Sequence, residues 1–366
     1  MTRSSRVKRW LLPALAFKAV VIGGGYATGR ELVEFFLPSG PLGGVLGMLL
    51  ATALWSAICA LTFLTARSVA ATDYGSFFKR LLGPAAPLFD VVYLALVTIV
   101  LSVAAAAAGE IAHASLGWPP IAGTLLLMSG VALVTGRGNA SVESLFKYVA
   151  IFLYGVYAVF VILVVLHAGD RIADAFTTAP AVGGDWVLGG LTYAGYNVIA
   201  AIAILPVTRH FQGRRDAVIA GLLCGPLAML PALLFFVCMG AWYPSIASAT
   251  LPSDYVLSRI DAPAFRAVFQ AMIFLALLET GAGLVHAANE RIAGLAARRG
   301  ATVTSKQRTA LSLALLVFAV FVAAHLGLVA LIASGYRFLA LLVIAVFVVP
   351  LVTRGVWLVV ESSRRE

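Results

Sequence analysis

Long apolar runs follow one another along almost the whole chain, and short segments rich in Gly, Pro and charged residues separate them. A run of about 18 or more apolar residues is long enough to cross the hydrocarbon core of a bilayer as an α-helix. The pattern predicts ten membrane-spanning helices, at about residues 11–37, 42–66, 86–113, 120–136, 145–168, 186–208, 216–242, 264–290, 309–332 and 337–359. Since no polar stretch is long enough for a separate soluble domain, we expect residues 1–366 to form a single transmembrane domain.

The composition agrees with this interpretation. Hydrophobic residues make up 61% of the chain and charged residues 11%, and the mean hydropathy is +0.99. Such values are typical of integral membrane proteins. The three cysteines, Cys59, Cys224 and Cys238, fall inside predicted spans without the spacing of metal ligands, so we expect neither a disulfide, nor a metal site, nor a bound cofactor.

The formal net charge of +10 follows the predicted topology. A basic chain can bind nucleic acid, but here most Lys and Arg residues fall on the side of the ten spans that also holds both termini. Positive residues gather on the cytoplasmic side of membrane proteins. We therefore expect a multi-pass protein in a lipid bilayer, with both termini cytoplasmic and no nucleic-acid partner.

Ten spans with both ends on one side can be divided into five plus five. Because five is odd, the second half would then cross the membrane upside down relative to the first, as in an inverted repeat. Tyr26-Ala27 in the first span matches Tyr193-Ala194 in the sixth, and Glu110 in the third span matches Glu279 in the eighth at nearly the same spacing. We expect repeats at about residues 10–168 and 186–359.

Two spans contain residues that favour unwinding of the helix. Gly23-Gly24-Gly25 lies about halfway along the first span, and residues 193–197 (YAGYN) lie within the sixth. In lipid, backbone polar groups must be paired within the protein unless they line a cavity. An unwound span offers amides that suit a carboxylate and carbonyls that suit a cation, as an amino acid carried with Na⁺ or H⁺ would need. The alternative is close helix packing, which we favour for Gly43 with Gly47 and for Gly221 with Gly225.

Two charged residues lie deep inside predicted spans. Lys18 follows Trp10 by about 12 Å of helical rise, too far to reach bulk water easily. We expect its ammonium group to pair with a carboxylate, and Glu279 in the eighth span lies at the most suitable depth. The pair would be either a structural ion pair or a site that takes up and loses a proton during a transport cycle.

Charged residues also follow the glycine cluster, toward the outer face. We predict an outer gate that includes Arg30, Glu31 and Glu110, with Arg30 and Glu110 as its ion pair. The alternative is that these side chains, like Glu34, lie at solvated helix ends.

The stretch GGGYATGRELVEFF (residues 23–36) resembles the first-span pattern of YkvI-like bacterial membrane proteins, Gly-x-Gly-aromatic-Ala-Ser-Gly-Gln-Glu followed by aromatics. YAGYN resembles their sixth-span Tyr-x-x-Tyr-Asn. These proteins are similar to the amino acid–polyamine–organocation superfamily, whose five-plus-five inverted repeat is the LeuT-type fold. The resemblance implies an all-α integral membrane fold with broken first and sixth helices, in the bacterial cytoplasmic (inner) membrane.

The resemblance also implies a central substrate site between the first and sixth helices. Carried over by position, its residues would be Gly23, Gly24, Gly25, Tyr26, Tyr193, Tyr196 and Asn197. Thr280 would stand where sodium-coupled members place a hydroxyl against first-span carbonyls. The chain departs from the pattern with Tyr26 for Phe, Thr28 for Ser and Arg30 for Gln, and only one hydroxyl is available around Thr280. Together with Lys18 nearby, these departures favour a proton or an ion pair over a sodium site.

The sequence therefore predicts a secondary active transporter that moves an amino acid or a similar small zwitterionic or organic solute by alternating access, coupled to H⁺ or Na⁺. A solute sensor derived from a transporter, or a channel-like membrane protein, is the alternative. An enzyme is not expected, because the chain carries no HExxH, no GxSxG and no cluster of metal ligands.

Overall fold

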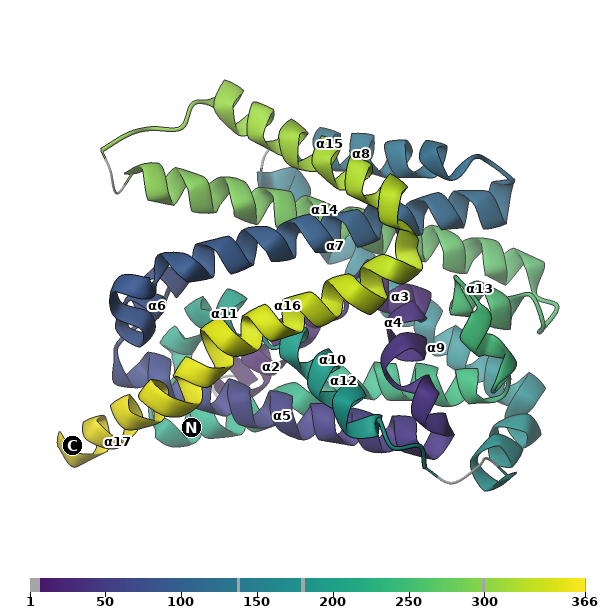
Figure 1. Ribbon diagram of the computed structural model, residues 1–366, viewed down its shortest axis with the longest axis horizontal. Coiled ribbons are helices and arrows are strands. Elements are labelled where there is room, and N and C mark those ends of the chain that lie inside the picture. Colours follow the sequence, from purple (N-terminus) through teal and green to yellow (C-terminus); the bar gives the residue numbers. More distant parts are fainter. Residues whose placement is uncertain (1–6, 137–138, 179–181, 298–299, 366) are drawn as a thin grey trace.

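The computed structural model describes the chain except for residues 1–6, 137–138, 179–181, 298–299 and 366, and all secondary structure in the described residues is helical. Most of the long helices run along the horizontal axis of Figure 1 and pack into one bundle. Labels with η denote short 3₁₀ or π segments. Up to the 179–181 gap the elements are η1 (Val7–Leu11), α2 (Leu12–Val21), α3 (Gly24–Thr28), α4 (Arg30–Phe35), η2 (Leu37–Ser39), α5 (Gly40–Ser68), α6 (Tyr74–Leu82), η3 (Gly83–Ala85), α7 (Pro87–Leu116), α8 (Pro120–Gly136) and α9 (Asn139–Thr178).

The remaining elements follow the gap at residues 179–181. They are α10 (Trp186–Asn197), α11 (Ala200–Ala203), η4 (Leu205–His210), α12 (Arg214–Gly240), η5 (Ser245–Ser248), α13 (Pro252–Leu257), α14 (Pro263–Ala297), α15 (Ser305–Ala330), η6 (Leu331–Gly335), α16 (Tyr336–Val343), η7 (Ile344–Val348), η8 (Leu351–Gly355) and α17 (Val356–Arg365).

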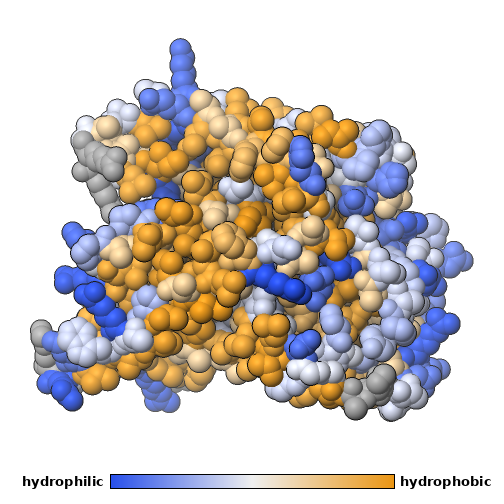
Figure 2. Space-filling model, in the orientation of Figure 1, coloured by the Kyte–Doolittle hydropathy of each residue, from blue (hydrophilic) through white to orange (hydrophobic). Residues whose placement is uncertain are grey.

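Seven helical stretches within the described residues are long and apolar enough to cross a membrane, and α8 is a shorter apolar helix. Figure 2 shows hydrophobic residues across the middle of the visible face, with hydrophilic residues gathered toward its two sides. The chain is therefore a multi-pass membrane protein. The number of these stretches differs from the ten predicted spans for two reasons. The first predicted span is divided into short helices, and Ser305–Arg364 forms one stretch with a break at Gly327 (φ +72°). The ten-helix inverted repeat thus stays a prediction.

Small residues bring α5 and α12 into backbone contact. A Cβ atom built on Gly221 would lie 2.3 Å from the backbone of Ala60, and one built on Gly225 would lie 2.2 Å from the carbonyl oxygen of Thr52. Neither space admits a side chain, so the packing predicted for this glycine pair is confirmed. The contact is strengthened by Ser56, whose hydroxyl donates to the carbonyl of Leu222 (3.0 Å).

The first and last helices meet at the start of α12. The Asp216 carboxylate accepts from the indole of Trp10 (2.6 Å) and from the Arg9 guanidinium (3.3 Å). Arg214, two residues earlier, donates to the carbonyl of Val359 in α17 (2.7 Å). The two ends of the described chain therefore lie at the same end of the bundle (Figure 1), which we call the terminal end.

Candidate functional site

The backbone of the first helix is interrupted where the glycine cluster predicted it. Helix α2 ends at Val21, and Gly23 is extended (φ −105°, ψ −175°) before α3 begins at Gly24. A second bend follows at Gly29 (φ +79°), which separates α3 from α4. Of the three predicted glycines, Gly23 forms the interruption, whereas Gly24 and Gly25 open the short helix α3.

Thr280 of α14 lies directly beside this interruption. A Cβ atom on Gly23 would lie 3.1 Å from the Thr280 hydroxyl oxygen, which is tighter than ordinary van der Waals contact. The hydroxyl also donates to the carbonyl of Ala276 in its own helix (2.9 Å). The structure thus brings Gly23 and Thr280 together.

A cluster of buried tyrosines from several helices begins at Tyr26, three residues after the interruption. Tyr26 of α3 faces Tyr157 of α9 with ring centroids 6.1 Å apart, and Tyr193 lies 5.7 Å from Tyr196 on α10. Tyr196 in turn packs 4.5 Å from Tyr336 of α16. The five residues are buried, so this part of the bundle is closed to solvent in the structure.

The prediction of unwound backbone at YAGYN was wrong. Residues 193–197 are helical and complete α10, and the Asn197 side chain donates back to the carbonyl of Tyr193 (3.1 Å). The regular α-helix ends only at Val198, where the next amides bond three residues back. Gly195 serves packing instead of unwinding, because a Cβ atom there would lie 3.0 to 3.2 Å from Ile344 and Ala340.

Glu31 lies inside the bundle and not at the outer gate where we expected it. Its side chain is on α4, only 6% of the residue is exposed, and its carboxylate accepts a hydrogen bond from the Tyr196 hydroxyl (2.6 Å). This bond links α4 to α10. The bend at Gly29 rotates α4 relative to α3. The position of Glu31 in the sequence therefore does not show whether its side chain points into the bundle or toward the outer face.

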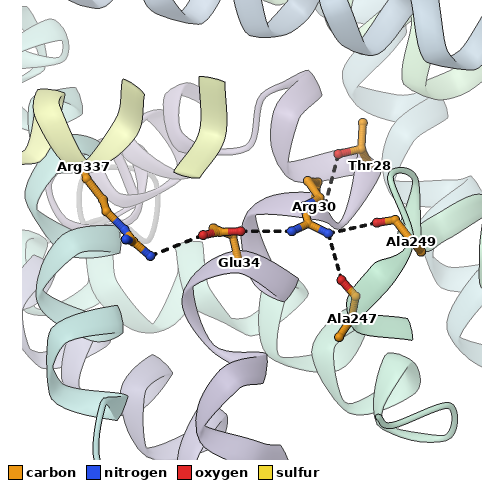
Figure 3. Close-up of polar contacts among 6 residues, drawn as sticks. All are labelled: Thr28, Arg30, Glu34, Ala247, Ala249 and Arg337. Carbon is orange, nitrogen blue, oxygen red and sulfur yellow. Dashed lines mark hydrogen bonds and ion pairs between the residues drawn. The ribbon is translucent and has the colours of Figure 1, made fainter. Parts of the chain in front are cut away.

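Arg30 pairs with Glu34 one helical turn later instead of with Glu110. Its guanidinium donates to Glu34 (3.0 Å) and to the carbonyls of Ala247 (3.1 Å) and Ala249 (3.0 Å), and Glu34 also pairs with Arg337 (3.3 Å), as Figure 3 shows. Residues four apart on a helix are neighbours, so this local partner is available without any rearrangement. These contacts, which we call the Arg30 cluster, lie toward the end of the bundle opposite the terminal end (Figure 1).

Glu110 belongs to a separate cavity of about 290 Å³ between α7, α8 and α15. Its lining includes Thr124 and the break at Gly327. The predicted Arg30–Glu110 ion pair is therefore not formed, because Glu110 faces other helices.

Lys18 and Glu279 also remain separate. The Lys18 ammonium lies 4.0 Å from the centroid of the Tyr154 ring, a cation–π contact, and the described residues include no carboxylate within ion-pair distance of it. Glu279 is half-buried on α14 and lies within electrostatic reach of the same tyrosine. Tyr154 thus supplies Lys18 with the favourable contact that we expected from a carboxylate.

Sequence reasoning missed Asp216, whose carboxylate holds Arg9 and Trp10 at the terminal end. Besides Trp10 and Arg9, its carboxylate accepts from the backbone amide of Gln212 (2.9 Å). The only signal was an acidic residue directly after two arginines, Arg214 and Arg215, which reads as an ordinary charged loop.

Comparisons with known proteins agree with this architecture. No family model matches the chain. The uncharacterized membrane protein YkvI of Bacillus subtilis is 25% identical over an alignment of 222 residues, which covers 58% of this chain and 60% of that protein. MhsT in complex with L-phenylalanine superposes with a TM-score of 0.64 at 15% identity, covering 99% of this chain and 98% of that one. The fold is LeuT-type.

Two more solved structures share the LeuT-type fold. A manganese transporter of Eremococcus coleocola has a TM-score of 0.56 at 16% identity, covering 95% of this chain and 79% of that one. Mhp1, a nucleobase-cation-symport-1 family transporter with bound bromovinylhydantoin, has a TM-score of 0.52 at 14% identity, covering 91% and 74%. The predicted resemblance is thus confirmed, and these LeuT-type neighbours are transporters, not enzymes.

Proposed function

We propose that the protein is a secondary active transporter that moves an amino acid or a similar small zwitterionic or organic solute by alternating access. The observation that carries this proposal is the interruption at Gly23, half-buried beside Thr280 and followed along the chain by the buried Tyr26. A break in the middle of an apolar bundle leaves backbone groups without helical partners, and a solute can take their place.

The chemistry around the interruption favours an organic solute. The final turn of α2 ends in carbonyl oxygens, which attract a cationic group, and the first turn of α3 begins with amides, which attract a carboxylate. The proposed lining is Gly23, Gly24, Gly25, Tyr26, Tyr193, Tyr196 and Asn197. Its aromatic rings supply apolar surface for a carbon skeleton, and the ligands of MhsT and Mhp1 are organic molecules.

Alternating access needs contacts that close each end of the bundle in turn. We assign these roles to the Arg30 cluster at one end and to Asp216 with Arg9 and Trp10 at the other. In this proposal the ten helices form the five-plus-five inverted repeat over about residues 10–168 and 186–359. The first helix would be broken at Gly23 and the sixth near Val198. The termini would face the cytoplasm across the bacterial inner membrane.

Coupling to an ion follows from the same site. Thr280 places a hydroxyl beside the interrupted backbone, where Na⁺ would find oxygen ligands, whereas Lys18 and Glu279 are the proton carriers that the sequence suggested. Coupling to a proton and coupling to a sodium ion are two versions of the proposal, and the next experiment distinguishes between them.

The test uses purified protein in liposomes and labelled amino acids, nucleobases and amines, with an imposed Na⁺ or pH gradient. We expect one of the two gradients to drive accumulation of at least one solute, and the matching ionophore to abolish it. Gly23→Val, which places a branched side chain against Thr280, should stop this flux, whereas Arg337→Ala at the exposed rim should not. Binding without flux would favour the sensor alternative, and flux that no gradient drives would favour a channel.

A further inference from the structure

Glu31 is a carboxylate buried in the middle of the bundle with a single hydrogen bond from Tyr196. Within the described part of the chain, no Lys, Arg or His nitrogen lies within 4.0 Å of it. Burying an ionised carboxylate without a countercharge costs several kcal/mol or more, and such a group usually takes up a proton instead. The closed structure therefore favours the neutral acid at this position.

The surroundings of Glu31 offer hydroxyls but no positive charge. The titratable groups that interact with its charge are Tyr26, Tyr157, Tyr193, Tyr196 and Tyr336, contributed by α3, α9, α10 and α16. The hydroxyls of the first three are buried, and none has a hydrogen-bond partner among the residues that the structure describes. Since buried polar groups are nearly always paired, three such hydroxyls around one carboxylate suit a site that small polar species occupy.

The neighbouring arginine does not neutralise Glu31. The Arg30 guanidinium is directed toward Glu34 and toward the carbonyls of Ala247 and Ala249, as Figure 3 shows. The Arg30 charge is thus paired with groups at the end of the bundle, while the side chain of Glu31, the next residue, points into the bundle.

We propose that Glu31 carries the coupling proton of the transport cycle. This inference rests on the proposed function and assigns its coupling ion. A proton from water on one side binds the carboxylate while that end is open, travels with the closed site as the neutral acid, and leaves to water on the other side. Because the Tyr196 hydroxyl joins Glu31 to α10, the protonation state is linked to the packing of α4 against α10.

Glu31 fits this role better than Glu279. A carrier must lose contact with water when the site closes, and Glu31 is almost completely buried whereas Glu279 is half-buried. Glu31 also lies on the helix that follows the interruption at Gly23 and the bend at Gly29.

The first test needs no solute. Infrared spectra of the full-length protein in lipid nanodiscs are recorded across a pH series, and the carbonyl band of a protonated carboxylic acid is followed. We expect this band at neutral pH in the wild type, its loss in Glu31→Gln, and its retention in Glu279→Gln and Glu34→Gln. Tyr196→Phe keeps the carboxyl group but removes its donor, so the band should persist at a shifted frequency. A wild-type band that survives in Glu31→Gln would overturn the assignment.

The second test uses proteoliposomes and the solute that the wild type accumulates from the labelled panel. Glu31→Gln should retain exchange of labelled for unlabelled solute but lose accumulation driven by a pH gradient. Retained pH-driven accumulation would refute the coupling role, and loss of solute binding itself would show that Glu31 binds the ammonium group of the solute instead. If the wild type moves no solute, the proposed function fails, while the infrared result still decides whether Glu31 holds a buried proton.

Discussion

Two arginines share the carboxylate of Glu34 but differ in burial, which makes them a matched pair for testing how the bundle is closed. The side chain of Arg30 is 8% exposed and donates to two carbonyls in addition to Glu34, whereas that of Arg337 is 59% exposed and contacts Glu34 alone at 3.3 Å. Replacement of Arg30 with alanine should therefore open this end of the bundle far more than the same change at Arg337.

The expected size of the effect follows from the contacts. Arg30→Ala removes two charged hydrogen bonds to the segment that holds Ala247 and Ala249, at about 1.5 kcal/mol each, so the closed state loses about 3 kcal/mol. Glu34 keeps Arg337 as a partner and adds little to this cost. Since about 1.4 kcal/mol is a factor of ten, the open population should rise about 100-fold. Arg337→Ala removes an exposed ion pair worth about 0 to 1 kcal/mol, so its effect should stay below about fivefold.

A native cysteine serves as the reporter. Cys238 is 1% exposed on α12, and its neighbours Phe235 and Met239 face Gly29 next to the Arg30 cluster. With the other two cysteines replaced by alanine, a water-soluble thiol reagent should modify Cys238 only when this end opens. The measurement is the modification rate at fixed pH in nanodiscs, for the parent protein, Arg30→Ala and Arg337→Ala.

Equal rates for the parent and Arg30→Ala would show that the Arg30 cluster does not hold this end closed. A larger acceleration in Arg337→Ala than in Arg30→Ala would contradict the weighting of the two contacts by burial. Labelling of a urea-unfolded sample sets the maximum rate, so that general unfolding of a variant is recognised as such.

Three further predictions concern packing and the terminal end. Gly189→Ala should lower the free energy of unfolding by about 3 kcal/mol or more, because its Cβ atom would lie 1.9 Å from a carbonyl oxygen of α4. Gly155→Ala should leave the free energy of unfolding unchanged, because the space beside Gly155 is open. Gly23→Ala should weaken solute binding in a calorimetric titration, and the added change Thr280→Ala should restore it, since the clash is with that hydroxyl; additive losses would speak against this contact. Asp216→Asn should accelerate amide exchange in residues 7–21, because about 2 kcal/mol of charged hydrogen bonding is lost; unchanged exchange would mean that other contacts hold the terminal end.

The apolar pattern was enough to predict a helical membrane protein, and the glycine cluster predicted the interruption of the first helix. Both depend on local chemistry: the length of an apolar run and the unusual backbone freedom of Gly23. The contact between Gly23 and Thr280 came from the resemblance, not from the residues themselves.

The pairings of charged residues could not be predicted, because the sequence gives the depth of a residue but not the direction in which it points. Arg30 and Glu110 matched in depth, yet they face different helices. Lys18 matched Glu279 in depth, yet its ammonium lies over the Tyr154 ring. The bends at Gly23 and Gly29 remove the helical periodicity that would otherwise relate one side chain to the next. YAGYN failed for another reason: a glycine such as Gly195 serves close packing as readily as it permits unwinding.

The backbone contact between α5 and α12 joins parts of the chain that lie on opposite sides of the connection between α9 and α10. A continuous backbone is not required to hold such a surface together once it has formed. Two separately expressed fragments, one ending and the other beginning within that connection, would each present half of a close-packed interface along the lengths of these two helices. The folded protein would then not need the peptide bond between the halves. It would assemble from two polypeptides, each of which is labelled separately for spectroscopy.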